Sequence, residues 1–489
     1  MARGVRRSDM PLRTFAEDRH RLYDLRMSLE AYLNPESCPT ERPRLEDMHA
    51  STSTLHDGID EAIRSSGTPY LHPEGKTLQL DLLGSPNMIT WQESKISAMF
   101  EEECWSELPQ VYARYGTETT TSLLNEVKKL EGARAAVLTD CGMQACALLF
   151  DVLVENGSHA IIMRQSYNKT RVYLQKLCER VGAEYTLMDD GDYDALEAAI
   201  QENTSLIFAE TYTNPLMRAL DPDRMGELVL KKRSAGCGRL RLIVDNTIAT
   251  PWGPSKPLLQ YDGVDFVVAS GTKALGGQDR DLWGYVASNN TEALNQVMDL
   301  QAMRGGILDW RRAEALLKKL PGTEATYERR CAGAVKVAKL LTEHPKVSEV
   351  FHPSLADHVD NTTIASHYRL PGSLLSFRLK DADEDTTKRF CDVLATCVIL
   401  RYALSFDGLA TKLNHHATVS EYFTPAEELS KLGIDRLVRI GVGLEDADDL
   451  IACLNWALWN HEQVKDEELD NWRESRSRNL GIYPEAKDD

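Results

Sequence analysis

The chain has 489 residues, of which 42% are apolar and 27% are charged, which is ordinary for a globular protein of about two or three domains. Its net charge of −19 argues against nucleic acid or an anionic membrane surface as the main partner, because phosphate groups would be repelled over most of the surface. No apolar run approaches the roughly 20 residues of a membrane span. The ten cysteines are scattered, with no C-x-x-C pair and no histidine cluster beside them. This pattern indicates reduced thiols in the cytoplasm rather than a zinc or other metal site.

Residues 1–90 differ in composition from the rest of the chain. Leu22, Leu25, Leu29 and Tyr32 recur at helical spacing, which predicts one amphipathic helix. The stretches around this helix are rich in Pro, Ser and Thr and have no sustained period. The segment also lacks the apolar core of a signal peptide and is too acidic for a transit peptide. We therefore expect an N-terminal extension or arm rather than an independent domain.

Helices and short apolar runs alternate from about residue 120. A helix at Ser122–Glu131 precedes an apolar run at Ala135–Leu138, and a Gly142 turn leads into a helix at Ala145–Leu153. Further apolar runs, separated by helical segments, lie at His159–Met163, Ser205–Ala209, Leu240–Val244 and Asp265–Ala269. This alternation predicts a mostly parallel sheet with helices on both faces, in an α/β domain spanning residues 91–310.

The remainder, residues 311–489, is predicted to form a smaller C-terminal α+β domain. Its expected helices and strands are Arg312–Leu320, Tyr327–His344, Gly372–Leu379, Leu437–Val442 and Asp446–Asn460.

Ligands of open parallel sheets gather at the carboxyl ends of the strands, and Asp245 and Lys273 both follow apolar runs. Asp245 is either a simple Asx-turn residue or an ion-pair partner that keeps a pyridine nitrogen protonated, so that the ring acts as an electron sink. Lys273 ends the run Ser270-Gly271-Thr272-Lys273. Its two preceding hydroxyl groups suit phosphate oxygens, while its amine would reach the aldehyde of the same cofactor as a Schiff base.

Three other positions have a functional and a structural interpretation. Gly142-Met143 lies between a strand and a helix, as either a tight turn or a phosphate site at a helix N-terminus. Tyr167 either stacks on a planar ring or packs half-buried. Arg439 either binds a substrate carboxylate in bidentate fashion or forms a surface ion pair. The rival interpretation of the Gly142-Met143 turn is a nucleotide-binding loop, but neither of the glycine-rich sequence motifs of such loops, G-x-G-x-x-G and G-x-x-x-x-G-K-[ST], occurs in the chain.

Together these segments resemble the Cys/Met-metabolism family of pyridoxal 5'-phosphate (PLP) enzymes, which includes cystathionine γ-synthase, cystathionine γ-lyase and methionine γ-lyase. Residues 244–251 resemble the family's V-D-N-T-x-x-T-P, and residues 270–277 resemble its S-A-T-K-x-x-G-G. Residues 210–215 and 439–446 are also family-like, and the resemblance covers about residues 108–460. It implies the aspartate-aminotransferase-like fold (PLP fold type I), with PLP as the cofactor.

The resemblance also implies a role for each site residue. Lys273 would form the Schiff base and shuttle protons, Asp245 would pair with the pyridinium, and Tyr167 would stack on the ring. The phosphate would be held by Gly142, Met143, Ser270 and Thr272, with Tyr112 and Arg114 reaching it from a neighbouring subunit. The protein would then be a homodimer or homotetramer with shared active sites. Asn214, Ser405 and Arg439 would bind the carboxylate end of an amino-acid substrate.

The implied reaction is γ-elimination or γ-substitution on a methionine- or homoserine-related amino acid, by a lyase or transferase of the transsulfuration type. The chain departs from the family pattern mainly at substrate-facing positions. Lys169 replaces a small residue or Cys, residues 405–411 lack the usual Glu, and residues 117–119 and 278–281 also differ. Lys169 either adds a positive charge or a second base beside the substrate, or points to solvent. These departures leave open a specialised-metabolism lyase that expels a non-sulfur γ-leaving group. A nucleotide-dependent oxidoreductase and a PLP-binding protein without turnover are the more distant alternatives.

Overall fold

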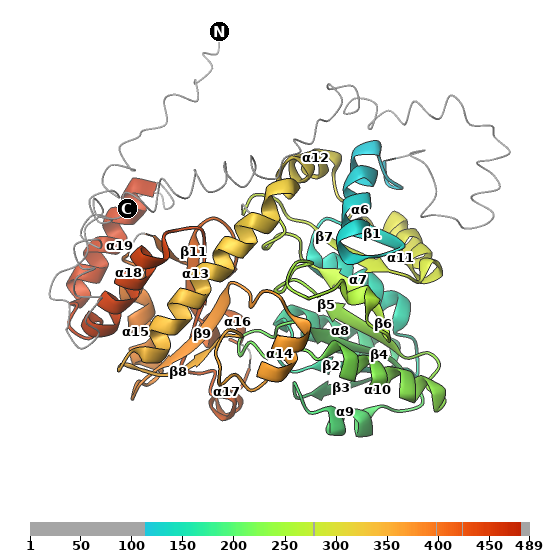
Figure 1. Cartoon of the computed structure of the whole chain (residues 1–489), viewed down its shortest axis with the longest axis horizontal. Coiled ribbons are helices and arrows are strands. Elements are labelled where there is room, and N and C mark those ends of the chain that lie inside the picture. Colours follow the sequence, from blue (N-terminus) through green and yellow to red (C-terminus); the bar gives the residue numbers. More distant parts are fainter. Residues whose placement is uncertain (1–112, 277–278, 398, 423, 481–489) are drawn as a thin grey trace, which may run out of the picture. The chain divides into compact units, whose positions relative to one another are not determined.

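The computed structural model describes residues 113–480 except 277–278, 398 and 423 (Figure 1). The expected N-terminal arm and Tyr112 lie outside the described residues. The chain divides into two compact units. Of the described residues, those up to Ala332 together with Phe351–Leu374 form the larger unit, and Gly333–Val350 and the residues from Leu375 onward form the smaller one.

The larger unit is built on a seven-stranded sheet with the order β1-β7-β6-β5-β4-β2-β3. Its strands are β1 (Ala135–Thr139), β2 (His159–Met163), β3 (Glu184–Met188), β4 (Thr204–Glu210), β5 (Arg241–Asp245), β6 (Val264–Ala269) and β7 (Gly284–Ser288). The pairs β2–β3, β2–β4, β4–β5 and β5–β6 are parallel, whereas β7 runs antiparallel to β1 and β6. The expected α/β fold with a mostly parallel sheet is therefore confirmed.

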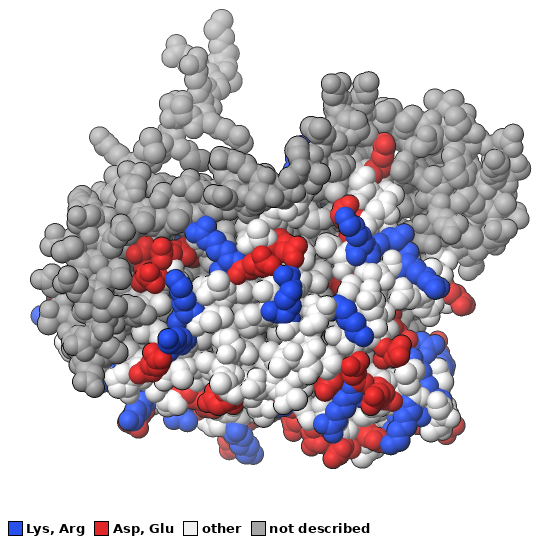
Figure 2. All heavy atoms as spheres, in the orientation of Figure 1, with Lys and Arg blue, Asp and Glu red and all other residues white. Residues whose placement is uncertain are grey.

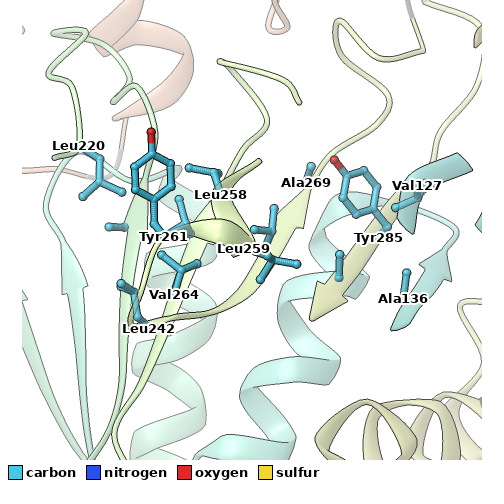
Figure 3. Close-up of a cluster of buried hydrophobic side chains, with 14 of the residues drawn as sticks. Val127, Ala136, Leu220, Leu242, Leu258, Leu259, Tyr261, Val264, Ala269 and Tyr285 are labelled. Carbon is cyan, nitrogen blue, oxygen red and sulfur yellow. The ribbon is translucent and has the colours of Figure 1, made fainter. Parts of the chain in front are cut away.

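Helices cover both faces of this sheet because alternate strand residues point to opposite sides. On β2, Ala160 and Ile162 pack with the helices of one face, and Ile161 and Met163 belong to the core cluster of the other. The first face carries α7 (Gly142–Leu153), α8 (Asn168–Val181) and α11 (Thr291–Arg304). The second carries α6 (Glu118–Glu131), α9 (Tyr193–Ala199), α10 (Pro222–Ser234) and α12 (Trp310–Lys319). Figure 3 shows part of the second core, including Val127, Leu242, Val264 and Tyr285.

In the larger unit, strands β3 and β7 were not predicted from the sequence, and each has a physical reason for its weak apolar pattern. The edge strand β3 is partly exposed along its whole length, so its residues do not form a buried apolar run. The antiparallel strand β7 reads Gly-Tyr-Val-Ala-Ser and is fully buried, but only three of its five residues are apolar. In contrast, β2 has the expected bounds, His159–Met163, because all five residues are buried.

The smaller unit contains a five-stranded sheet with the order β10-β11-β12-β9-β8. Its strands are β8 (Val347–Phe351), β9 (Leu374–Leu379), β10 (Leu400–Tyr402), β11 (Thr411–His415) and β12 (Leu437–Gly441). Its helices are α15 (Glu384–Leu394), α16 (His416–Ser420), α17 (Ala426–Leu432), α18 (Ala447–Asn460) and α19 (Asp466–Leu480). Helix α13 (Thr323–Glu343) begins in the larger unit and ends in the smaller one, and α14 (Asn361–His367) belongs to the larger unit. Asp446 caps α18 by accepting a hydrogen bond from the main-chain N–H of Asp448. The expected α+β character is confirmed for this part of the chain.

On the face that Figure 2 shows, acidic and basic side chains of the described residues are interspersed among uncharged ones. Among these residues, no helix is both long enough and apolar enough to cross a membrane. The eight cysteines of the described part of the chain are all free thiols.

Candidate active site

The carboxyl ends of three neighbouring strands bring the first site residues together. Glu210 ends β4, Asp245 ends β5, and Ser270 directly follows β6. Glu210 and Asp245 are partners in the parallel register. Their side chains share the face of the sheet that α7 and α8 cover, because Phe208 and Ile243, two residues earlier, belong to that core. The strand order therefore places two carboxyl groups side by side at the carboxyl edge of the sheet.

Asp245 does form the Asx-turn that the sequence allowed as the structural interpretation. Its Oδ1 accepts a hydrogen bond of 2.9 Å from the main-chain N–H of Thr247. The same threonine reaches further, because its Oγ1 accepts a 2.8 Å hydrogen bond from the N–H of Ser270. Thr247 thus ties the segment after Asp245 to the segment that leads to Lys273, which gives both residues a common main-chain frame.

Burial controls the charge on the two carboxyl groups. It raises the pKa of Asp245, although the hydrogen bonds from Thr247 act in the opposite direction. Burial also raises the pKa of Glu210, well above its ordinary value, and the nearby charge of Asp245 raises it further. The N–H of Tyr167 partly opposes this shift. Two adjacent buried carboxyl groups disfavour double ionisation, so the site favours a cationic ligand group beside them.

Lys273 is half-buried in a tight turn after β6. Its N–H donates to the carbonyl of Ser270 at 3.2 Å, and its carbonyl accepts from the N–H of Gly276 at 3.1 Å. The hydroxyl of the preceding Thr272 accepts from the N–H of Trp283 at 3.1 Å and donates to the Trp283 carbonyl at 3.2 Å. This hydroxyl therefore braces the turn against Trp283, the residue before β7, and it would turn its proton from the Trp283 carbonyl to a phosphate oxygen in order to bind one.

Gly142 is the first residue of α7 and lies against Ser270. A Cβ at position 142 would lie 2.6 Å from the Cβ and 2.8 Å from the Cα of Ser270, so no larger residue fits without movement. Cys141, the N-cap residue, makes no side-chain hydrogen bond to the helix end. The N–H of Gln144 donates to the Cys141 carbonyl at 3.2 Å, so the N–H groups of Gly142 and Met143 are the ones that would bind an anion, supported by the helix dipole. Gly142 is thus part of a close-packed cradle and not an isolated tight turn.

Tyr167 is the N-cap residue of α8 and is about half-buried, with 46% of it exposed. Its N–H donates to the Oε1 of Glu210 at 2.6 Å. Lys169 is exposed in the first turn of α8. Thr170 donates a hydrogen bond to the Sδ of Met143 at 3.6 Å, which joins the first turns of α7 and α8.

Three further residues of the expected set lie in loops or before a helix. Asn214 is half-buried in the loop after β4, where its N–H donates to the carbonyl of Gln165 at 3.2 Å. Arg114 precedes α6 and is exposed. Ser405, in the smaller unit, is half-buried and donates to the carbonyl of Phe406 at 3.4 Å.

Arg439 belongs to β12 of the smaller unit and is only 2% exposed. Its Nη2 donates to the carbonyl of Leu404 at 3.2 Å and to that of Ser405 at 3.5 Å. Its guanidinium lies 5.5 Å from the centre of the Phe406 ring. Arg439 is therefore not the surface ion-pair residue of the structural interpretation, and the structure brings it together with Ser405.

Sequence reasoning missed two buried acids that support the site. Glu210 ends an apolar run just as Asp245 does, and this signal was available in the sequence. Glu131, at the end of α6, accepts hydrogen bonds from Tyr285 at 2.6 Å and Asn246 at 3.2 Å. Burial raises its pKa to about 7, against the effect of these bonds. Glu131 holds the residue next to Asp245, and this link becomes visible only in three dimensions.

The chemistry of these groups fits PLP. An uncapped helix end and the Gly142–Ser270 cradle suit a phosphate. Buried carboxyl groups suit a protonated pyridine nitrogen, and the exposed Tyr167 ring is available for stacking.

Comparison with known proteins decides the family. The family model for the Cys/Met metabolism PLP-dependent enzymes matches residues 90–459. The chain belongs to this family. It is accordingly a PLP-dependent enzyme of the transsulfuration type, and the expected cofactor and PLP type I fold are confirmed. This membership goes against both the nucleotide-dependent oxidoreductase and the protein without turnover that the sequence left as distant alternatives.

Individual relatives agree with this assignment. The chain is 32% identical to cystathionine gamma-synthase 1, chloroplastic, of Arabidopsis thaliana, over 83% of this chain and 70% of the relative. It is also 32% identical to L-methionine gamma-lyase of Fusobacterium nucleatum subsp. polymorphum, over 72% of this chain and 87% of the relative. Among solved structures, cystathionine gamma synthase of Xanthomonas oryzae pv. oryzae in complex with cystathionine aligns with a TM-score of 0.66 at 26% identity. That alignment covers 72% of this chain and 88% of the solved chain.

Proposed function

We propose that the enzyme catalyses γ-elimination or γ-substitution on a methionine- or homoserine-related amino acid. The observation that carries this proposal is the meeting of Asp245, Ser270 and the α7 N-terminus around the Lys273 turn, in a chain of this family. Relatives that carry the names of γ-synthases and γ-lyases support the γ-position as the site of reaction.

In this proposal the larger unit holds the cofactor. When bound, PLP supplies an electron sink for the charge that develops on the substrate. The Lys273 amine would hold the cofactor and would move protons at the substrate's Cα and Cβ. Asp245 pairs with the ring nitrogen, and Tyr167 stacks on the ring. The phosphate is held by Gly142, Met143, Ser270 and Thr272.

Arg439 binds the substrate carboxylate, and Asn214 and Ser405 assist it. The burial of Arg439 supports this role, because a desolvated guanidinium binds a carboxylate more strongly than an exposed one does. Lys169 lies two residues after Tyr167 and acts on the side chain of the substrate.

The assembly we propose is a homodimer or homotetramer in which Tyr112 and Arg114 of one subunit reach the phosphate bound by another. The exposure of Arg114 agrees with such a role. We also propose an arm at residues 1–90, a PLP-binding domain at 91–310 and a smaller domain at 311–489. The cytoplasm is the proposed location, and the free cysteines of the described residues agree with it.

A substrate panel tests the reaction class. Purified protein is incubated with γ-substituted amino acids, with and without a thiol. Release of an α-keto acid and ammonia would demonstrate elimination, and a condensed product would demonstrate substitution. Borohydride reduction followed by peptide mass spectrometry should place the cofactor on Lys273. A colourless protein after addition of PLP, or a Lys273→Ala variant with the wild-type absorption band, would refute the assignment.

The second candidate is a lyase that expels a non-sulfur group from Cγ of an unusual amino acid. It is favoured by Lys169, which places an exposed cation in the first turn of α8. The panel therefore includes substrates with oxygen-linked γ-substituents. Faster turnover of these substrates than of their sulfur-linked counterparts would favour this candidate over the first.

A further inference from the structure

Gln165, in the turn between β2 and α8, makes hydrogen bonds to two other loops of the larger unit. Its side-chain Oε1 accepts a 2.9 Å bond from the hydroxyl of Thr213 and a 3.2 Å bond from the N–H of Leu216. Its carbonyl accepts a 3.2 Å bond from the N–H of Asn214. Its own N–H donates to the Oδ2 of Asp190 at 3.0 Å. One half-buried residue therefore connects the turns that follow β2, β3 and β4.

The turns that Gln165 joins carry two residues of the proposed site. Tyr167 follows Gln165 by two positions, and its N–H is held separately by Glu210. Asn214 lies between Thr213 and the Pro215-Leu216 segment, so Gln165 holds this loop on both sides of Asn214. The Thr213 hydroxyl also accepts a 2.9 Å bond from the N–H of Arg218, which closes the loop on itself.

We propose that Gln165 is a positioning residue that sets the placement of the Tyr167 ring and of Asn214 relative to each other through its hydrogen bonds to the Asn214 loop. This inference rests on the proposed function, because it assumes that Tyr167 contacts the cofactor and that Asn214 contacts the substrate. Small displacements of groups that orient a reactant lower the rate strongly, so the effect should be catalytic and not only structural.

The main variant is Gln165→Leu, which keeps the approximate size of the side chain and removes the accepting oxygen. It leaves the Thr213 hydroxyl and the Leu216 N–H without this acceptor, which frees the Asn214 loop to move. We expect kcat/KM to fall by about 10- to 100-fold, through a lower kcat together with a higher KM, while the cofactor content is retained. Visible circular dichroism of the bound cofactor should also change, because it reports the orientation of the ring in its asymmetric surroundings.

Two further variants make the test specific. Gln175→Leu is the matched control, because Gln175 lies on the exposed face of α8 and bonds only its neighbour Glu179, at 3.0 Å, among the hydrogen bonds found. Thr213→Val removes the donor on the other side of the Gln165 bond. Gln165→Leu should lower kcat/KM by a smaller factor in the Thr213→Val variant than in the wild-type protein, because the two residues share one interaction. Thr213→Val also carries the test by itself if Gln165→Leu does not fold, with the same expected rise in KM and change in circular dichroism.

The measurements are made on the holoenzyme with the amino acid that reacts in the substrate panel. Wild-type kcat/KM and circular dichroism in Gln165→Leu would overturn the inference. The inference would also be overturned if Gln165→Leu lowered kcat/KM no more than Gln175→Leu does. It would likewise be overturned if the effects of Gln165→Leu and Thr213→Val on kcat/KM were fully additive in the double variant. Failure of the proposed function is distinguishable, because it would appear in the wild-type protein as the absence of any γ-elimination or γ-substitution product before any variant is compared.

Discussion

Replacing Gly142 with alanine tests the cradle between α7 and the Ser270 segment. The added Cβ would lie 2.6 Å from the Cβ of Ser270 and 2.8 Å from its Cα. Carbon atoms normally approach to about 3.5–4.0 Å, so Ser270 would have to retreat by about 1 Å. The main chain of Ser270 is held by its 2.8 Å bond to Thr247, so the retreat is opposed. Overpacking of this kind costs about 1–3 kcal/mol.

Part of this free-energy cost lowers the stability of the fold, and the rest weakens the binding of the cofactor. If the Ser270 segment keeps its place, the free energy of unfolding of the apoprotein falls. If the segment moves, the proposed phosphate site widens and the dissociation constant for PLP rises, by about 5- to 150-fold if the whole cost appears there. Urea unfolding of the apoprotein and titration with PLP, followed by absorbance, measure the two losses. Together they should amount to about 1–3 kcal/mol.

Gly238→Ala is the control, because a Cβ at Gly238 would meet no atom within 4 Å. It should leave both quantities within about 0.5 kcal/mol of the wild type. A Gly142→Ala protein that unfolds like the control and binds PLP with wild-type affinity would refute the close packing on which the cradle depends.

Three other perturbations follow from the same site. Since burial raises the pKa of Asp245 above its ordinary 3.8, its ionisation destabilises the folded apoprotein as the pH rises from that value through the raised pKa. The Asp245→Asn apoprotein should therefore resist urea better than the wild type at about pH 8 and equally well in strong acid. It should also bind PLP more weakly. A variant that is less resistant to urea than the wild type at about pH 8 would contradict the sign of the pKa shift. If Arg114 completes the active site of a neighbouring subunit, the Arg114→Ala and Lys273→Ala variants should each be nearly inactive alone. Co-expression of the two variants should restore part of the activity in mixed oligomers. The absence of any restored activity would argue against shared active sites. Lys169→Ala should lower kcat/KM on the true substrate by about tenfold or more, with Lys176→Ala, on the same helix, as the control; unchanged kinetics would remove Lys169 from the mechanism.

The residues at which the central strands end could be predicted from the sequence, because buried parallel strands are continuous apolar runs. The five residues of β2 illustrate this, and Asp245 and Lys273 could be assigned to strand ends on the same basis. The family resemblance rested on the residues around these ends, and the family membership is confirmed. The structural interpretation of Arg439 as a surface residue was wrong, since the arginine is buried. Exposure depends on neighbours that lie far away in the chain, so a single position does not reveal it.

The amino-acid sequence by itself determined the kinds of group at the site: a lysine, an aspartate and small residues after apolar strands. Tertiary structure alone decided which of these groups touch. Glu210 lies beside Asp245 because β4 and β5 are adjacent in the sheet, and Gln165 holds the Asn214 loop because β2 is paired with β4. Strand order results from the crossover connections and from core packing across the whole sheet, so hydrogen bonds between distant loops form only when the fold is complete.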